Sequence, residues 1–390
     1  MRLALWTPRP DAAWVAALVP LLEREVPVEV VTRGAPPVAS LDLYHVADDP
    51  AHVFVLCALR RRPGVVLLAD WNLHRLARAE AVDRGGAVAY RTEARRAHGT
   101  TGAFVARQVE RGLGGELPSL LAMNDRVLDA SLGLVAFTES VRARATTRLP
   151  GTPVVHLPLD FVGARVDAPP RGAARDALGI PAGGFLVALL SAPGERAATA
   201  LRAVCAAEPL LRVQPWPEDP GARRRLLAAA DVAVALEHVP GGGLPSPLVR
   251  SIVAGVPTLV SAGTGAASDL PEGVAVRVSP GPTEAAELEA LLLRLVRDPR
   301  LRERVGALAR AHADARRDPA PAAHALLALA ADVERSSGEA RRAFDARRAE
   351  EGTLLASALE EMRWGARGLG LATLPPGIER LVAPLLREGR

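Results

Sequence analysis

The sequence predicts an α/β protein with two doubly wound, Rossmann-like domains that face a cleft, followed by a C-terminal helical extension. Short apolar runs alternate with helical patterns, which is typical of parallel sheets covered by helices on both faces. The alternation stops at a proline-containing linker over 163–172 and then starts again. Because 390 residues suffice for two full cores, we expect domains at 1–165 and 173–318 and the extension at 319–390.

The first half carries the apolar runs of one sheet. Apolar residues dominate these runs, as expected where a parallel sheet is buried on both faces. The expected strands are Leu3–Thr7, Val28–Thr32, Leu41–Val46, Val65–Ala69, Gly133–Thr138 and Val154–Leu157, and the expected helices are Asp11 to about Glu25, Arg91–Arg111 and Pro118–Ala130.

The second half repeats the pattern and then becomes wholly helical. Beyond Pro282, apolar residues recur three and four positions apart, which predicts amphipathic helices. The charged residues of the last helices are interpreted as a solvated face. The expected strands are Phe185–Leu190, Leu210–Gln214, Asp231–Leu236, Val256–Ser261 and Val274–Val278, and the expected helices before Pro282 are Ala173–Leu178, Arg196–Ala207 and Leu248–Ala254.

A glycine turn after the strand at 231–236 is the leading candidate for a binding motif. Gly241, Gly242 and Gly243 have no side chains, so a ligand can approach the main chain there. A strand, a glycine turn and a helix N-terminus in succession offer a site for a phosphate. The alternative is an ordinary tight crossover of an α/β domain, because a glycine cluster alone is a weak signal.

The helix after this turn has start and stop residues of its own. Ser246 is expected to cap its N-terminus and Pro247 to open its first turn, where a missing N–H costs nothing. Gly255 is expected to end the helix, because glycine readily adopts the left-handed conformation found there.

The composition restricts the class of protein. A formal charge of +4, despite a pI near 9.9, and 3% aromatic residues argue against a nucleic-acid partner. Cys57 and Cys205 form neither a metal spacing nor a disulfide framework, which predicts a reducing compartment. Without a long apolar run or a signal-peptide pattern at the N-terminus, we expect a cytoplasmic protein with no transmembrane segment.

Several longer stretches match a known pattern. In the second half they are DALGIP at 176–181, TLVSAGTGAASDLP at 258–271 and LEALLLRLVRDPRLRERVGALAR at 288–310. In the first half they are DLYHVADDPAHVFVLCALRRRPGVVLLADWNLHRL at 42–76 and SLLAMNDRVLDASLGLVAFTESVRA at 119–143. Together they resemble bacterial family 4 glycosyltransferases of the GT-B fold, and the resemblance covers nearly the whole chain.

The resemblance implies a nucleotide-diphosphate sugar held by the second domain, with Arg196 as the basic contact of its diphosphate. The charge that develops on a leaving diphosphate must be met by cations and backbone N–H groups. The glycine turn and Ser246 therefore belong to the expected donor site. Arg250, which lies shortly after them, either adds positive charge or points into solvent.

The sequence also departs from the family. PRPDAAW at 8–14 stands where the family has a glycine-rich turn, and Ala69 replaces a histidine. The family's two glutamates, spaced Glu-x7-Glu, would fall at Gly242 or Gly243 and at Arg250, none of which is a carboxylate. Two hypotheses stay open: a retaining glycosyltransferase, and a catalytically inactive homologue that acts as a binding or scaffolding partner.

An acceptor is expected at the carboxyl ends of the first domain's strands. Asp70 and His74 follow one strand, and they either bind an acceptor hydroxyl or pair with each other. His45 ends another strand at the same edge, and Glu237 is a candidate replacement for a missing carboxylate. We expect no metal and no cofactor besides the nucleotide-sugar substrate. The acceptor, the oligomeric state and a peripheral membrane contact stay open.

Overall fold

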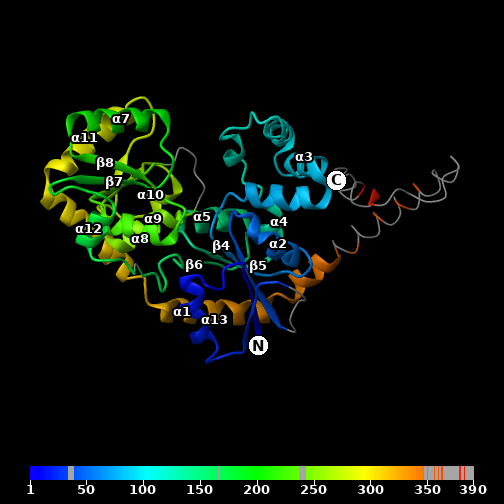
Figure 1. Ribbon diagram of the computed structural model, residues 1–390. Helices are drawn as coiled ribbons and strands as arrows, with labels where there is room; N and C mark the ends of the chain where they lie inside the picture. The colour runs from blue at the N-terminus through cyan, green and yellow to red at the C-terminus, as the bar shows by residue number, and fades with distance from the viewer. Residues whose placement is uncertain are drawn as a thin grey trace.

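The computed structural model contains two parallel sheets, each covered by helices on both faces (Figure 1). It describes residues 1–33, 39–165, 167–236 and 243–346, together with isolated residues beyond 346. We call the unit around the first sheet the first domain and the unit around the second sheet the second domain. Within the described residues, all eleven expected strands are found, and their ends agree with the predictions to within two residues.

The first sheet has the strand order β2-β1-β3-β4-β5-β6, and all its neighbouring strands are parallel. Alternate residues of one strand face opposite cores: Leu3 and Leu5 pack with α1 and α13, whereas Ala4 and Trp6 pack with α2, α4 and α5. Burial on both faces explains the continuously apolar runs. The elements are β1 (Leu3–Trp6), α1 (Ala13–Leu22), β2 (Val28–Val31), β3 (Leu41–Val46), η1 (Pro50–His52), α2 (Val53–Leu59), β4 (Gly64–Leu68), α4 (Asp125–Asp129), β5 (Ser131–Ala136), α5 (Glu139–Arg148), β6 (Val154–His156) and α13 (Pro319–Ser336).

The second sheet has the order β11-β10-β9-β7-β8, also parallel. One face packs on α7 and α11 and the other on α6, α8, α9 and α12. The elements are α6 (Arg171–Ala177), β7 (Phe185–Leu189), α7 (Glu195–Ala207), β8 (Leu211–Pro215), α8 (Pro220–Ala229), β9 (Val232–Ala235), α9 (Ser246–Ala254), β10 (Thr258–Ser261), α10 (Gly265–Asp269), β11 (Val276–Val278), α11 (Glu284–Arg297) and α12 (Pro299–Asp314).

Helix α13 returns to the first domain, where it packs against α1 and β5 (Figure 1). Gly133 of β5 permits this approach, because a Cβ there would lie 2.7 Å from a side-chain methyl of Val333. Residues 338–346 are also helical. The last helix, expected at Pro375–Glu388, falls almost wholly outside the described residues.

An arm formed by α3 (His74–Glu110) and η2 (Leu117–Leu120) stands beside the first sheet and has a small core of its own. The glycines Gly86 and Gly99 have φ of 67° and 58°, which break the regular helix. The chain folds back here, since Arg91 and Glu110 form an ion pair at 2.9 Å. The predicted helix at Pro118–Ala130 is wrong: α4 is all that forms there besides η2, and Met123 between them has φ of 51°.

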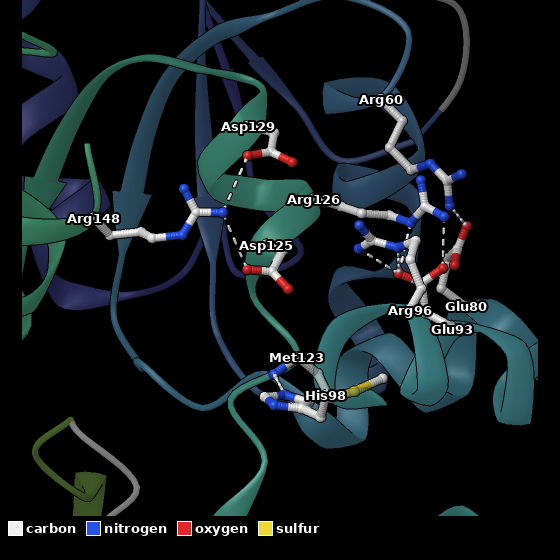
Figure 2. Close-up of polar contacts among 10 residues, drawn as sticks. All are labelled: Arg60, Glu80, Glu93, Arg96, His98, Met123, Asp125, Arg126, Asp129 and Arg148. Carbon is white, nitrogen blue, oxygen red and sulfur yellow. Dashed lines mark hydrogen bonds and ion pairs between the residues drawn. The ribbon is translucent and has the colours of Figure 1, made fainter. Parts of the chain in front are cut away.

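A buried ion-pair network attaches this arm to the body of the first domain (Figure 2). Glu93 accepts two hydrogen bonds of 2.7 Å from the Arg126 guanidinium and also pairs with Arg96 at 2.8 Å. Glu80 of the arm pairs with Arg60 at 2.5 Å. Burial tends to raise the pKa of Glu93, but Arg126 and Arg96 lower it by more, so Glu93 is ionised at neutral pH.

Candidate functional site

A cavity of about 500 Å³ lies between the two domains, at the carboxyl edges of both sheets. The first domain lines it with the loops that follow β1, β3, β4 and β6, and the second domain lines it with the start of α9. The order of the first sheet reverses between β1 and β3, which is the switch point where open α/β sheets bind ligands. The cavity therefore occupies the position at which this fold class holds substrates.

The second domain lines the cavity with one face of α9, from Ser246 to Val253, and with the two residues before this helix. Pro245 occupies the N-cap position and Ser246 the first helical position, and no side chain caps this terminus. The prediction that Ser246 caps the helix is therefore wrong by one residue, whereas Pro247 lies in the first turn as predicted. The other prediction is confirmed: Gly255 ends the helix with φ of 69°.

Ser246 and Arg250 lie together on the cavity wall. The Arg250 Nε is 3.5 Å from the Ser246 Oγ, as expected one helical turn apart. The first turn of a helix has N–H groups without acceptors and carries a partial positive charge. Together with the Arg250 guanidinium, it makes this wall suited to an anion.

Gly243 brings the second domain into direct contact with the first. A Cβ on Gly243 would lie 2.4 Å from the Asp70 Oδ1 and 2.5 Å from the Ala69 carbonyl oxygen. Only glycine therefore fits this position as the chain enters α9. Gly241, Gly242 and the candidate Glu237 lie outside the described residues.

Arg196 lies in the first turn of α7, which follows β7. Its side chain is exposed and is not among the residues that line the cavity. Because β7 and β9 are neighbours, the loop before α7 still lies beside the end of β9, where the Ser191 hydroxyl donates to the Leu236 carbonyl at 3.0 Å. Arg196 thus shares the sheet edge with the cavity but lies outside its wall.

The first domain contributes a group of carboxyls. Asp70 accepts the Asp48 N–H at 2.9 Å, and Asp48 accepts the Leu76 N–H at 3.0 Å. Burial raises the pKa of Asp48 to about 6, and burial together with the Asp70 charge raises the pKa of Asp160 to about 8. The pKa of Asp70 is also raised, again mainly by burial. Carboxyls in this range can exchange protons near neutral pH.

Two histidines complete the first-domain wall. The His45 Nδ1 lies 3.0 Å from the Thr7 Oγ1, and the His45 and His52 rings meet edge to face with centroids 4.8 Å apart. Burial lowers the pKa of His45 to about 3 and of His52 to about 4. Both imidazoles are therefore neutral and can exchange hydrogen bonds with an uncharged hydroxyl.

His74 is buried away from the cavity. Its Nε2 lies 2.7 Å from the Tyr90 hydroxyl, inside the arm formed by α3 and η2. Asp70 and His74 thus have different partners, and the alternative that they pair with each other is wrong. The structure brings His45, Asp70, Ser246 and Arg250 together around the cavity and leaves His74 out.

Sequence reasoning missed several ionisable residues of the cavity wall, among them Arg9, Asp48, His52 and Asp160. Each follows a strand of the first sheet, namely β1, β3 or β6. The rule that ligands sit at the carboxyl ends of parallel strands was applied to β4 and could have been applied to every strand. Within the described part of the chain, no group of three or more His, Cys, Asp or Glu side chains is placed to hold a metal ion. No described helix has both the length and the apolarity needed to span a membrane.

Comparison with known proteins gives structural relatives only. No family model matches the sequence, and no curated protein matches it either. The sucrose-phosphate synthase of Thermosynechococcus elongatus has a TM-score of 0.52 at 15% identity, over 85% of this chain and 99% of that one. HepE of Anabaena, solved with UDP and glucose, has a TM-score of 0.47 at 15% identity over 84% of this chain and 98% of its own. WaaG, a glycosyltransferase involved in lipopolysaccharide biosynthesis, has a TM-score of 0.46 at 16% identity over 82% of this chain and 98% of its own. Two parallel sheets in this arrangement, matched over nearly the full length of a sucrose-phosphate synthase, show that the chain has the GT-B fold of glycosyltransferases.

Proposed function

We propose that this protein is a glycosyltransferase, related to family 4, that moves a sugar from a nucleotide-diphosphate donor to an acceptor hydroxyl. The observation that carries this proposal is the composition of the cavity walls. The second domain offers a helix N-terminus with Arg250, which suits a diphosphate, and the first domain offers Asp70 and Asp160, which suit a hydroxyl. A glycosyltransferase needs a diphosphate site and an acceptor-hydroxyl site close enough for both to contact the transferred sugar.

On the donor side, we assign the diphosphate to the first turn of α9. Ser246 and Arg250 would contact its oxygens, and so would the backbone of the glycine turn that ends at Gly243. Arg196 lies at the same sheet edge, outside the cavity wall. Its guanidinium would contact the donor only after its side chain moves toward the cavity. The proposal includes no resident metal or cofactor.

On the acceptor side, we assign the hydroxyl to Asp70. In the reaction, the bond between the anomeric carbon and the phosphate oxygen breaks and the acceptor oxygen takes its place on that carbon. The hydroxyl proton passes to Asp70 or to the leaving diphosphate, whose negative charge the arginine neutralises. We propose retention of configuration, as the family resemblance implies, and NMR of the product anomer tests it.

The second candidate function is that of a catalytically inactive homologue serving as a binding or scaffolding partner. It is favoured by the contact of Gly243 with Asp70, which leaves no space for a carboxylate side chain at Gly243, one of the two glycines at which the first family glutamate would fall. Arg250 occupies the other place. A homologue of this kind would keep the fold and lose the turnover.

Calorimetric titration with UDP, GDP and their common sugar conjugates tests the proposal. We expect one nucleotide to bind, and Arg250→Ala to weaken it by about 1.5–3 kcal/mol, the usual contribution of a charged hydrogen bond. Arg24→Ala is the matched control, because Arg24 is exposed at the far end of α1. Absence of binding by every nucleotide at millimolar concentration would contradict the transferase. Binding without hydrolysis or transfer across a panel of acceptors would favour the inactive homologue.

A further inference from the structure

Arg9 lies on the first-domain side of the cavity, opposite Arg250. It follows β1, in the segment PRPDAAW that replaces a glycine-rich turn, and its backbone is fixed at both ends. The Arg9 N–H donates to the Thr7 Oγ1 at 3.1 Å, and the Arg9 carbonyl accepts the Ala12 N–H at 3.1 Å. Thr7 is itself buried against His45. The turn therefore holds an arginine at a set place on the cavity wall.

The charges of Arg9 and Arg250 are not neutralised by strong partners. The ion pair of Arg9 with Asp11 is long, at 3.7 Å, and exposed on both sides, so it contributes little. Among the described residues, Arg250 has no ion-pair partner, and its one hydrogen bond is to Ser246. Both guanidiniums are free to meet an anion.

Further arginines add to the same positive field. Partial burial lowers the pKa of Arg250, and the charges of Arg223, Arg9 and Arg224 lower it further. Arg223 and Arg224 lie on α8 of the same domain, whereas Arg9 acts on Arg250 from across the cleft. The cavity carboxyls offset this field only in part at neutral pH: burial raises the pKa of Asp160 to about 8, which keeps it mostly protonated, whereas Asp48, with a pKa of about 6, is mostly charged. An anion with more than one charge would relieve the repulsion between the two walls.

We infer that Arg9 and Arg250 form an anion clamp across the cleft, which grips a nucleoside diphosphate from both domains and draws the domains together. This inference rests on the proposed function and adds a second phosphate-binding residue to it. In this chain the Arg9 guanidinium would supply the donors that a glycine turn after β1 supplies through its backbone. A planar guanidinium can meet two phosphate oxygens at once.

Titrations of UDP and GDP into the wild type and the Arg9→Gln, Arg250→Gln and Arg24→Gln variants test the clamp. We expect Arg9→Gln and Arg250→Gln each to weaken the nucleotide about 10- to 100-fold, and Arg24→Gln to leave it unchanged. Arg9→Lys should recover only part of the affinity, because lysine keeps the positive charge but lacks the planar guanidinium that binds two phosphate oxygens at once. Small-angle X-ray scattering with saturating nucleotide should show the wild type, but not Arg9→Gln, becoming more compact.

The outcomes separate the clamp from the function on which it rests. If the wild type binds and Arg250→Gln weakens binding while Arg9→Gln does not, the clamp is overturned and the transferase proposal survives. If Arg9→Gln still becomes more compact with nucleotide bound, the clamp is likewise overturned. If no nucleotide binds the wild type, both proposals fail together.

Discussion

Asp269 of the second domain binds Ser140 in the first turn of helix α5 of the first, whose N-cap is Thr138: its Oδ1 accepts the Ser140 N–H at 3.0 Å and its Oδ2 accepts the Ser140 hydroxyl at 2.9 Å. A carboxylate at a helix N-terminus satisfies an N–H group without an acceptor and meets the positive end of the helix dipole. Because α5 follows β5 and α10 follows β10, this contact joins the same sheet edges that bound the cavity. It holds the two domains in the arrangement that encloses the candidate site.

Replacing Asp269 by Ala should weaken this contact between the domains. We expect a loss of about 1.5–3 kcal/mol, the usual contribution of hydrogen bonds to a charged group, together with a larger radius of gyration in solution. Urea unfolding followed by tryptophan fluorescence and small-angle scattering provide the two measurements. Asp332→Ala serves as the control, because Asp332 lies exposed on α13 and pairs only within its own helix. Equal effects of the two variants would mean that the contact does not hold the domains.

Replacing Gly243 by Ala should impair nucleotide binding more than folding. The new methyl would collide with the Asp70 Oδ1 and the Ala69 carbonyl, so the start of α9 must move away from the first domain. We expect weaker UDP or GDP binding by about tenfold or more, since a displacement of about 1 Å can cost that much in a preorganised site. Gly172→Ala is the control, because a Cβ at Gly172 meets nothing within 4 Å. Unchanged affinity in Gly243→Ala would show that α9 does not have to approach Asp70.

Replacing Glu93 by Gln should loosen the arm formed by α3 and η2. The change leaves Arg96 and Arg126 around a buried group without charge (Figure 2), at a cost of about 3 kcal/mol or more. Hydrogen exchange should rise within residues 74–121 and change little in the second domain. Glu116→Gln, at an exposed position of the same arm, should have no such effect. A uniform rise across both domains would contradict local attachment by Glu93.

Glu93 and Asp160 should give the stability opposite dependences on pH. The folded-state pKa of Glu93 lies below its ordinary value of 4.5, so its contribution is present above that pH and is lost as the pH falls. The folded-state pKa of Asp160 is raised from 3.8 to about 8, so stability decreases as the pH rises through that interval. Asp160→Asn should therefore stabilise the protein at pH 8 by about 1 kcal/mol or more and make the profile flatter between these values. Urea unfolding at a series of pH values measures both slopes, and an Asp160→Asn profile parallel to the wild type would contradict the assignment.

The sequence predicted the fold better than it predicted the site. Strands such as β4, whose residues Gly64–Leu68 are apolar and all buried, give a strong apolar signal that tertiary context does not alter. The helix predicted at Arg91–Arg111 falls within α3, to within one residue at its end. The rest of the arm formed by α3 and η2 was missed because its boundaries depend on the backbone at Gly86, Gly99 and Met123, where a positive φ leaves no mark in the apolar pattern. Apolar periodicity marks the regular elements and says little about where an irregular chain turns.

The cavity residues show the same division. Asp70 was found because it follows a strand with a clear apolar pattern. Asp160 follows the short strand β6, and only the structure shows that it is buried and that the Asp70 charge raises its pKa. Arg9 was overlooked because its segment was considered for the glycines it lacks and not for the charge it carries. That Arg9 of the first domain and Arg250 of the second line the same cavity depends on how the domains are placed, which the linear sequence does not give.

The return of α13 has a consequence for how this protein is made. The chain crosses between the domains after β6 and again between α12 and α13, and the two crossings touch, with the Gly163 N–H donating to the Arg317 carbonyl at 3.0 Å. Paired links of this kind permit bending about the junction and oppose free rotation. Helix α13 supplies Leu326, Leu329 and Val333 to the hydrophobic core of the first domain, next to β1 and β5. Because α13 follows the second domain in the chain, the ribosome must synthesise the second domain before the core of the first can be completed. The first domain therefore completes its fold only after the second domain and α13 have been synthesised.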